Sequence, residues 1–533
     1  MQIQVRINEE GTLRNQRFAF TDRYTLISEL LQNARRAGAS HIAVTYDLDK
    51  QCLVVTDDGR GIEDFQKLLT FNESGWDSST CEREHPFGVG FSKCLYAASR
   101  CVVTSGQQHV DFDTASALDR AVIEVVSNGN ASASAGTRIE LHGVDLPDLT
   151  TRMPDLCRGF PVPVDFNGAA VERPHALPSL GCIPTDIGYV HLAGTQDGKY
   201  SSQTFVYLQG FCVLRMGYYY VHGDINVVHL NPQLFQARLP DRDKLIDENE
   251  QHDRIYAQVK ACWRKVLKDA RLNLEPQRFV SDYYAAMRHW GHLDLLNTVD
   301  TLPHSLFESI SGYPIQEGAG SRDYLTTVNV APTRQDIEDG KTILAELDPL
   351  DESNAGYWMF AKTKGYLVFD VGGLAADHWI QAYVQRPEEQ TLSMTPVSER
   401  MRTELDGRWI WAPVVLCESV RIQVGNEAVD IVEEGVVHGD TLLIPAQEFS
   451  GESVRQLSDF EDENDQFQEG DLDADRDSLA ALIGHLRSVD PVQTLNALLV
   501  QLRLGTYPLL QGKAFEVRVG SHGATDLTIA VVE

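Results

Sequence analysis

Two short polar segments near the N-terminus restrict this chain more than any other feature. The first, E-L-L-Q-N at residues 29–33, lies within a helical pattern, and the second, T-D-D-G-R-G-I at 56–62, follows an apolar strand pattern. On a helix, Glu29 and Asn33 share one face. A carboxylate beside an amide suits hydrolysis of a metal-bound phosphate ester, because the carboxylate can orient or deprotonate water and the amide oxygen can bind Mg²⁺.

The second segment adds a binding function to the first. Asp57 ends a strand, and a buried carboxylate there can accept the exocyclic amine hydrogen of adenine, a contact that guanine does not offer. Gly59 and Gly61 have no β-carbon and let the backbone approach a ligand closely.

Two further segments fit the same pocket. H-P-F-G-V-G-F-S-K at 85–93 places two glycines before a helix, where backbone N–H groups and the helix dipole suit a phosphate. Thr137 follows Gly136 at the start of a strand, and its hydroxyl could reach the pocket. Each of these signals is weak alone, and their order is the informative part.

The first 170 or so residues alternate strand and helix patterns. Apolar spacing predicts helices over 26–37, 63–69, 91–98 and 149–157, with a polar lid over 70–86. β-Branched runs predict strands over 3–7, 41–46, 52–56, 100–105, 121–126, 137–141 and 161–166. Several strands follow one another directly, so we expect an α/β sandwich rather than βαβ repeats.

This order of motifs resembles the GHKL (Bergerat) ATPases, which include gyrase B, the ninety-kilodalton heat-shock chaperones, histidine kinases and MutL. The gyrase B version of the second motif is similar to V-T-D-D-G-R-G-I. The chaperone versions are closer to the lid sequence N-E-S-G-W and to the G-V-G-F-S segment. Residues 1–172 are therefore expected to form the ATP-binding domain. One departure is that many relatives place an acid after the Asn, where this chain has Arg35 and Arg36.

The resemblance implies a role for each matching position. It implies Glu29 as the base that activates water, Asn33 as the Mg²⁺ ligand and Asp57 as the reader of adenine. The remaining expected nucleotide contacts are Gly59 and Gly61 beneath the base, Gly88, Val89, Gly90 and Phe91 at the phosphates, and Thr137 near the adenine.

A transducer-like α/β domain is expected over 173–275, with strands over 188–192, 204–208 and 211–214 and a long helix over 247–269. Such a domain would supply a basic side chain to the γ-phosphate, where it would stabilise charge developing in the transition state. The segment A-R-L-P-D-R-D-K-L-I offers Arg238, Arg242 and Lys244, of which we favour Arg242.

Residues 276–533 carry weaker sequence patterns. We expect a mixed α/β region over 276–457, with a helix over 281–298 and β structure over 357–444. An acidic linker is expected over 458–477, since 459–477 holds ten acids and one Arg. A C-terminal α/β region over 478–533 should begin with a helical pair over 478–504 and end in strands.

The composition of the chain limits the kinds of partner that it is expected to bind. With 46 basic and 77 acidic residues the net charge is −31, so we do not expect the chain to bind nucleic acid mainly through its phosphates. No apolar run is long enough to span a bilayer and no secretory pattern opens the chain, so we expect a cytoplasmic protein without a membrane partner. The nine cysteines contain no C-x-x-C pair, which predicts buried or incidental thiols.

The expected function is an ATP-binding, Mg²⁺-dependent ATPase that works as a chaperone-like conformational machine, with a closing lid, a homodimer and a protein client or effector. One alternative is an ATP-switched sensor or regulatory protein with negligible turnover, in stress response or phage defence. The other is a MutL-like or topoisomerase-like enzyme that processes DNA.

Overall fold

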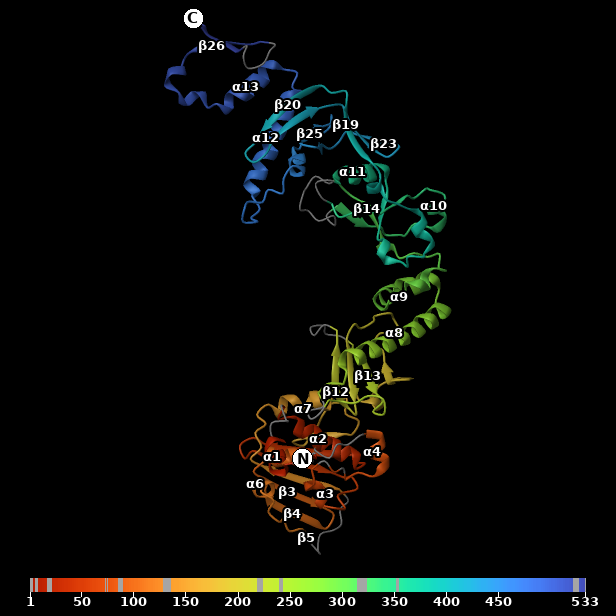
Figure 1. Cartoon of the computed structure of the whole chain (residues 1–533). Helices are drawn as coiled ribbons and strands as arrows, with labels where there is room; N and C mark the ends of the chain where they lie inside the picture. The colour runs from red at the N-terminus through yellow and green to blue at the C-terminus, as the bar shows by residue number, and fades with distance from the viewer. Residues whose placement is uncertain are drawn as a thin grey trace. The chain divides into compact units, whose positions relative to one another are not determined.

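The computed structural model describes residues 3–4, 8–16, 22–71, 73, 75–84, 90–127, 136–217, 224–238, 243–313, 324–350, 354–520 and 527–532. The chain divides into two compact units, residues 1–295 and 296–533, which are described separately (Figure 1). None of the helices in the described ranges combines the length and the apolar character needed to cross a membrane.

The first unit begins with an eight-stranded mixed sheet in the order β5-β4-β3-β6-β2-β1-β7-β8. All neighbouring pairs are antiparallel except β1 and β7. The strands are β1 (Ile42–Asp47), β2 (Cys52–Asp57), β3 (Arg100–Ser105), β4 (Gln108–Asp113), β5 (Val126–Ser127), β6 (Thr137–His142), β7 (Val164–Phe166) and β8 (Ala169–Ala170).

Helices of the same region accompany this sheet, and some of them contribute residues to the core on its apolar face. They are α1 (Glu9–Gln16), α2 (Thr25–Arg36), α3 (Gln66–Leu69), α4 (Ser78–Glu84), α5 (Ser92–Ala97), α6 (Thr114–Leu118) and α7 (Leu149–Cys157). The apolar side of α2 is almost fully removed from water, and Leu26, Ile27 and Leu31 pack with strand residues such as Leu53 and Val103 in one core. The predicted α/β sandwich is confirmed for this part of the chain, and its buried helix α2 carries Glu29.

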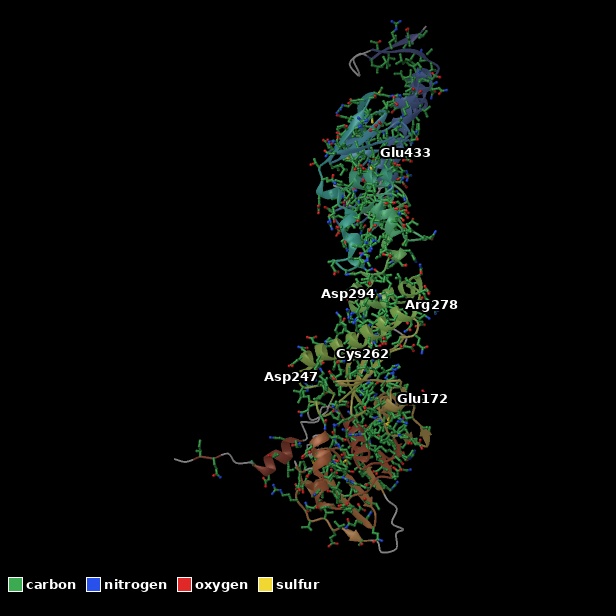
Figure 2. The ribbon with its side chains drawn as sticks, turned by 90° about the vertical axis from the view of Figure 1, so that its right-hand side faces the viewer. Glu172, Asp247, Cys262, Arg278, Asp294 and Glu433 are labelled. Carbon is green, nitrogen blue, oxygen red and sulfur yellow. The ribbon has the colours of Figure 1, made fainter. Side chains whose placement is uncertain are left out.

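A second sheet in the same unit has the order β12-β11-β13-β10-β9. Its strands are β9 (Ile183–Thr185), β10 (Gly188–His191), β11 (Thr204–Leu208), β12 (Phe211–Met216) and β13 (Asn226–Leu230). The helices α8 (Glu248–Asn273) and α9 (Pro276–Trp290) follow. Figure 2 labels Asp247, just before α8, and Cys262 within it. Trp263 of α8 stacks on Trp290 of α9, with ring centroids 6.4 Å apart.

Within its described residues, the second unit contains four further sheets. They have the strand orders β15-β14-β17-β16-β18, β19-β22-β23, β20-β21-β25-β24 and β26-β27. The strands are β14 (Phe307–Ile310), β15 (Leu325–Thr327), β16 (Leu344–Ala345), β17 (Leu367–Phe369), β18 (Val384–Gln385), β19 (Leu392–Val397), β20 (Met401–Asp406), β21 (Trp411–Leu416), β22 (Ser419–Val424), β23 (Glu427–Ile431), β24 (Val436–His438), β25 (Thr441–Ile444), β26 (Ala514–Val519) and β27 (Leu527–Val532). The helices are α10 (Arg334–Glu338), α11 (Ala355–Lys364), α12 (Glu469–Arg487) and α13 (Pro491–Gln501).

The acidic stretch differs from its prediction as a solvated linker over 458–477. Its second half is the first part of α12, where Leu472 is buried and Asp475 is fully buried. The carboxylate of Asp475 accepts the backbone N–H groups of Arg408, Trp409 at 2.9 Å and Ile410 at 2.7 Å. Burial of a carboxylate on three N–H donors is a long-range arrangement, and charge density along the sequence does not reveal it.

Smaller differences have local causes. The strand predicted over 121–126 is irregular up to residue 125, and only Val126 and Ser127 pair, at the sheet edge. The β region predicted from 357 begins instead with helix α11. The lid predicted as a loop contains α4, whose start is stabilised by Asp77, which accepts the backbone N–H of Thr80 at 2.9 Å. In the strand predicted over 3–7, residues 5–7 lie outside the described residues.

Candidate nucleotide site

Helix α2 brings the predicted catalytic pair to one cavity. Glu29 is 5% exposed and Asn33 is half-buried, one helical turn further along the same face. The cavity has a volume of about 540 Å³, and Glu29, Asn33, Asp57, Gly61, Gly90, Phe91 and Thr137 all line it. Residues from α2, β2, β6 and the segment before α5 therefore meet at one site, as their order in the sequence predicted.

Asp57 occupies the end of β2, directly opposite Thr137 on β6 in the sheet register. Its Oδ1 accepts the backbone N–H of Gly59 at 2.9 Å. Burial raises the pKa of Asp57, and the charge of Asp58 adds to this, whereas the Gly59 N–H opposes it. The structure thus places a partly desolvated carboxylate in the cavity, as a group that discriminates by hydrogen bonding requires.

The neighbouring Asp58, in contrast, stabilises the fold. It accepts the Ser40 hydroxyl and the backbone N–H groups of Ser40 at 2.7 Å and His41 at 3.0 Å, and these contacts, the hydroxyl first, lower its pKa to about 2. Asp58 therefore ties the α2–β1 connection to the end of β2, and it is not among the residues that line the cavity.

Two glycines are required by close packing at this site. A β-carbon at Gly90 would collide with the Glu29 carboxylate, so the backbone at 90 lies directly against the candidate base. Gly61 has φ +81° and a β-carbon there would lie 2.7 Å from the Ser105 hydroxyl, which accepts the backbone N–H of Ile62 at 2.7 Å. A side chain at either position would therefore collide with neighbouring atoms.

The outer wall contains residues that the motifs did not identify. The Arg60 guanidinium lies over the Trp76 ring, 5.2 Å from its centroid, and Arg60 Nη1 lies 3.4 Å from the Asp77 carboxylate. All three residues line the cavity. The D-S-S-T pattern at 77–80 is typical of a helix start and could have indicated α4, but nothing in the sequence indicated the Arg60–Trp76 contact.

Arg35 and Arg36, the departure from the usual acidic pattern, bind an acid from the lid. Arg35 Nη1 donates to Glu84 Oε1 at 3.1 Å, and Arg36 Nε donates to Glu84 Oε2 at 3.0 Å. Burial would raise the pKa of Glu84, but the hydrogen bonds and charges of Arg35 and Arg36 outweigh it and lower that pKa. We call these three residues the lid triad. They hold the end of α4 against the helix that carries Glu29.

The second sheet contacts the same region through one turn. Gln209, between β11 and β12, accepts a hydrogen bond from Gln32 Nε2 and donates from its own Nε2 to the Glu84 backbone carbonyl at 3.3 Å. Gln209 and Gly210 both have positive φ, +54° and +93°, as in a type I′ hairpin turn. A single residue of the second sheet therefore contacts both α2 and the end of the lid helix.

Of the basic residues predicted for the γ-phosphate, the structure describes Arg238 and Lys244. Arg238 lies 3.7 Å from Asp243 and Lys244 lies 4.0 Å from Glu248, and neither lines the cavities of the described part of the chain that include Glu29. Arg242 lies outside the described residues, as do Gly88 and Val89. Arg215 on β12 does line a second cavity of about 380 Å³ that shares Glu29 with the first.

These features define an α/β-sandwich nucleotide-binding domain, with an acid and an amide on one buried helix and a desolvated aspartate at the end of the neighbouring strand. Residues 24–145 match the family described as "Histidine kinase-, DNA gyrase B-, and HSP90-like ATPase". The chain therefore contains a GHKL-type ATPase domain at these residues, as its motifs predicted. No curated protein matches the chain.

Proposed function

We propose that this chain is an ATP-hydrolysing conformational machine of the chaperone-like GHKL type. The observation that carries the proposal is the convergence of Glu29, Asn33, Asp57 and Thr137 on one cavity. In this proposal Asp57 and Thr137 bind the adenine side of ATP, and Glu29 accepts a proton from the water that attacks the γ-phosphate, which leaves ADP and inorganic phosphate.

Mg²⁺ suits this donor set. Asn33 offers a neutral amide oxygen, a ligand that Mg²⁺ accepts, on the same cavity wall as Glu29. The ion would neutralise phosphate charge, and Asn33 would hold it. Arg215, from the second sheet, is a better supported candidate than Arg238 or Lys244 for a basic group near the phosphates, because it lines a cavity that includes Glu29.

Turnover and binding separate the proposed roles. In Glu29→Ala we expect ATP to bind while steady-state and single-turnover hydrolysis are lost, typically by about 100-fold or more for a missing general base. Asp57→Asn should lose binding. Glu172→Gln, an exposed acid in the same unit (Figure 2), is the control and should match the wild type. Equal hydrolysis rates in wild type and Glu29→Ala would refute the mechanism.

The alternatives predict different results in the same assays. A sensor that uses ATP only as a ligand would bind it with the same dependence on Asp57 and show no burst of ADP in a single turnover. A DNA-processing enzyme would show hydrolysis stimulated by added duplex DNA. We expect turnover without such stimulation, since the chain carries a net charge of −31.

The proposed homodimer has a candidate interface at the C-terminal hairpin of β26 and β27. In its register Phe515 faces Val531, Val517 faces Ile529 and Val519 faces Leu527, which puts six apolar side chains on one face. Five of these are 40–68% exposed. An isolated two-stranded sheet is marginally stable, and a contiguous apolar face of this kind marks an interaction site.

A second copy of this chain is the occupant we propose for that face. The face itself is uncharged, and the charges of the hairpin, Glu516 and Arg518, pair with each other at 2.7 Å on the opposite side. A standard interface buries roughly 800 Å² on each partner, so α13, whose Val492 and Val500 are also exposed, would have to contribute.

Light scattering on the full chain tests the interface. Ile529→Asp, on the apolar face, should convert dimer to monomer. Thr528→Asp, on the opposite face of the same strand, should leave the dimer intact. A wild-type chain that remains a monomer with and without ATP, or a dimer in both variants, would reject this interface.

A further inference from the structure

The first sheet has a second face, directed away from the nucleotide cavity, with its own cluster of reactive side chains. Alternation along β2 buries Leu53 and Val55 in the core and leaves Cys52 half-buried on the other side. On β6 the same alternation buries Leu141 and leaves Glu140 and His142 half-buried on that other side. These three residues are not part of the proposed ATPase machinery.

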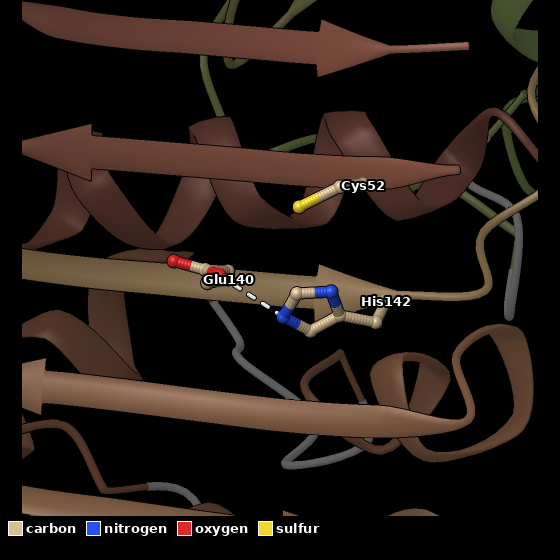
Figure 3. Close-up of side chains that lie close together, drawn as sticks. All are labelled: Cys52, Glu140 and His142. Atoms are coloured by element: carbon tan, nitrogen blue, oxygen red, sulfur yellow. Dashed lines mark ion pairs between the residues drawn. The ribbon is translucent and has the colours of Figure 1, made fainter. Parts of the chain in front are cut away.

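The geometry of the three side chains is compact. Cys52 lies directly opposite His142 in the register, and Glu140 precedes His142 by two residues on the same face (Figure 3). One ligand atom from each residue, a thiol sulfur, a carboxylate oxygen and an imidazole nitrogen, lies within 4.8 Å of the other two. His142 Nε2 is 3.0 Å from Glu140 Oε1.

We propose that Cys52, Glu140 and His142 bind a divalent transition-metal ion, for which Zn²⁺ is the best match. A thiolate, an imidazole and a carboxylate are the ligands that Zn²⁺ takes in proteins, at about 2.0–2.3 Å. Tetrahedral coordination at such bond lengths separates ligand atoms by about 3.3–3.8 Å, so the present spacing requires side-chain shifts of roughly 1 Å. Three protein ligands leave a fourth position for water.

The surrounding charges support this assignment. Arg138 Nη2 is 2.9 Å from Glu140 Oε2, whereas Oε1 faces His142, so Arg138 can orient the carboxylate without occupying the oxygen that the ion would use. Arg100, on the neighbouring strand β3, is paired with Asp111 at 2.5 Å, so its guanidinium is bound by that carboxylate.

The thiol itself must lose a proton when the ion binds. Burial raises the pKa of Cys52, and the negative charges of Glu140 and Asp47 add to this increase. The same two carboxylates attract a cation, and Asp47, opposite Cys52 on β1, is held by Lys50 at 2.8 Å. The bound ion would therefore replace a proton on sulfur, as in other thiolate sites.

A bound ion would also bear on the nucleotide cavity. It would join β2 to β6, and the far ends of these strands carry the opposed pair Asp57 and Thr137. The ion would thus fix the pairing of the two strands from the solvent side. We expect slower hydrogen exchange in β2 and β6 and a higher unfolding temperature when the ion is bound.

The experiment uses the full chain, stripped with a chelator and free of nucleotide and Mg²⁺, titrated with Zn²⁺ by calorimetry. Titration with Co²⁺ is followed by absorption, because a thiolate ligand produces a charge-transfer band. We expect one ion per chain and a band that depends on Cys52. Cys52→Ser and His142→Ala should each weaken binding by more than about 100-fold, since loss of an outer contact alone costs 10–100-fold.

Two matched variants control for adventitious binding. Cys182→Ser removes a thiol of similar burial away from the cluster, and His109→Ala removes a half-buried imidazole two strands away on the same sheet. Both should bind as the wild type does. The proposal is overturned if the wild type binds no ion, or if Cys52→Ser keeps the affinity and the band while its circular dichroism shows a folded protein.

Discussion

Removal of the Glu84 carboxylate should release the lid helix α4, because the side chains of the lid triad are almost fully excluded from solvent. The side chains of Arg36 and Glu84 are 2% and 6% exposed, and that of Arg35 is 18% exposed. Loss of one member of a buried pair costs about 3–5 kcal/mol, since the remaining charge is left without compensation. Because Arg35 can recover part of its hydration, we take the lower value, about 3 kcal/mol.

Hydrogen exchange of residues 78–84 measures this effect where it occurs. If opening of α4 breaks the triad, a loss of about 3 kcal/mol increases exchange by roughly 100-fold, at tenfold per 1.4 kcal/mol. Glu84→Ala leaves the backbone carbonyl that accepts from Gln209, so the change reports the carboxylate alone. Glu82→Ala, an exposed position on the same helix, is the control and should change exchange little.

The triad should also respond to acid in a defined direction. The pKa of Glu84 is lowered in the folded protein, so its contribution to stability is present above the ordinary carboxyl value and is lost as pH falls through the folded pKa. Protection of α4 should therefore decline in wild type on acidification and hardly change in Glu84→Ala. Equal exchange in Glu84→Ala and Glu82→Ala at neutral pH would refute the reasoning.

Three further predictions test other parts of the structure. Gly90→Ala should abolish ATP hydrolysis, because the added methyl group collides with the Glu29 carboxylate; steady-state ADP release measures this. The pKa of Asp57 is raised by burial, so its charge opposes folding at neutral pH, and this cost falls as pH drops. Asp57→Asn should therefore match or exceed the wild-type unfolding temperature while losing ATP binding. In the wild type, affinity for ATP should decline on acidification at a higher pH than it would if the aspartate were exposed. Asp475→Ala leaves three backbone N–H groups without their acceptor and should destabilise the second unit by about 3 kcal/mol or more, read by thermal unfolding, whereas the exposed Asp477→Ala should have little effect.

The sequence predicted those parts of the site that depend on local spacing. Glu29 and Asn33 follow from one helical turn, and Asp57 from the end of an apolar strand followed by glycines. The bounds that the sequence predicts for β2, β6 and α7 agree with the structure within one residue at either end. Such elements are specified by residues close to them in the chain.

Contacts between distant segments were not predictable. In the sequence Arg35 and Arg36 are only a departure from the usual acidic pattern, because their partner Glu84 is almost fifty residues away. Cys52 meets His142 across two strands rather than along one segment, so the spacing of the cysteines in the sequence could not indicate the proposed metal-binding cluster. The burial of Asp475 is decided by the backbone of 408–410, so an acidic stretch in the sequence became a helix packed on a sheet.

The turn at Gln209 has a consequence for which residue this position can tolerate. A left-handed backbone costs an ordinary side chain about 1–2 kcal/mol, and glycine or asparagine would adopt it more readily. Neither would reach both Gln32 and the Glu84 carbonyl, since glycine has no side chain and asparagine is one methylene shorter. Glutamine at this position therefore combines a strained backbone with a side chain long enough for both contacts, and substitution by glycine would relax the hairpin while removing both hydrogen bonds.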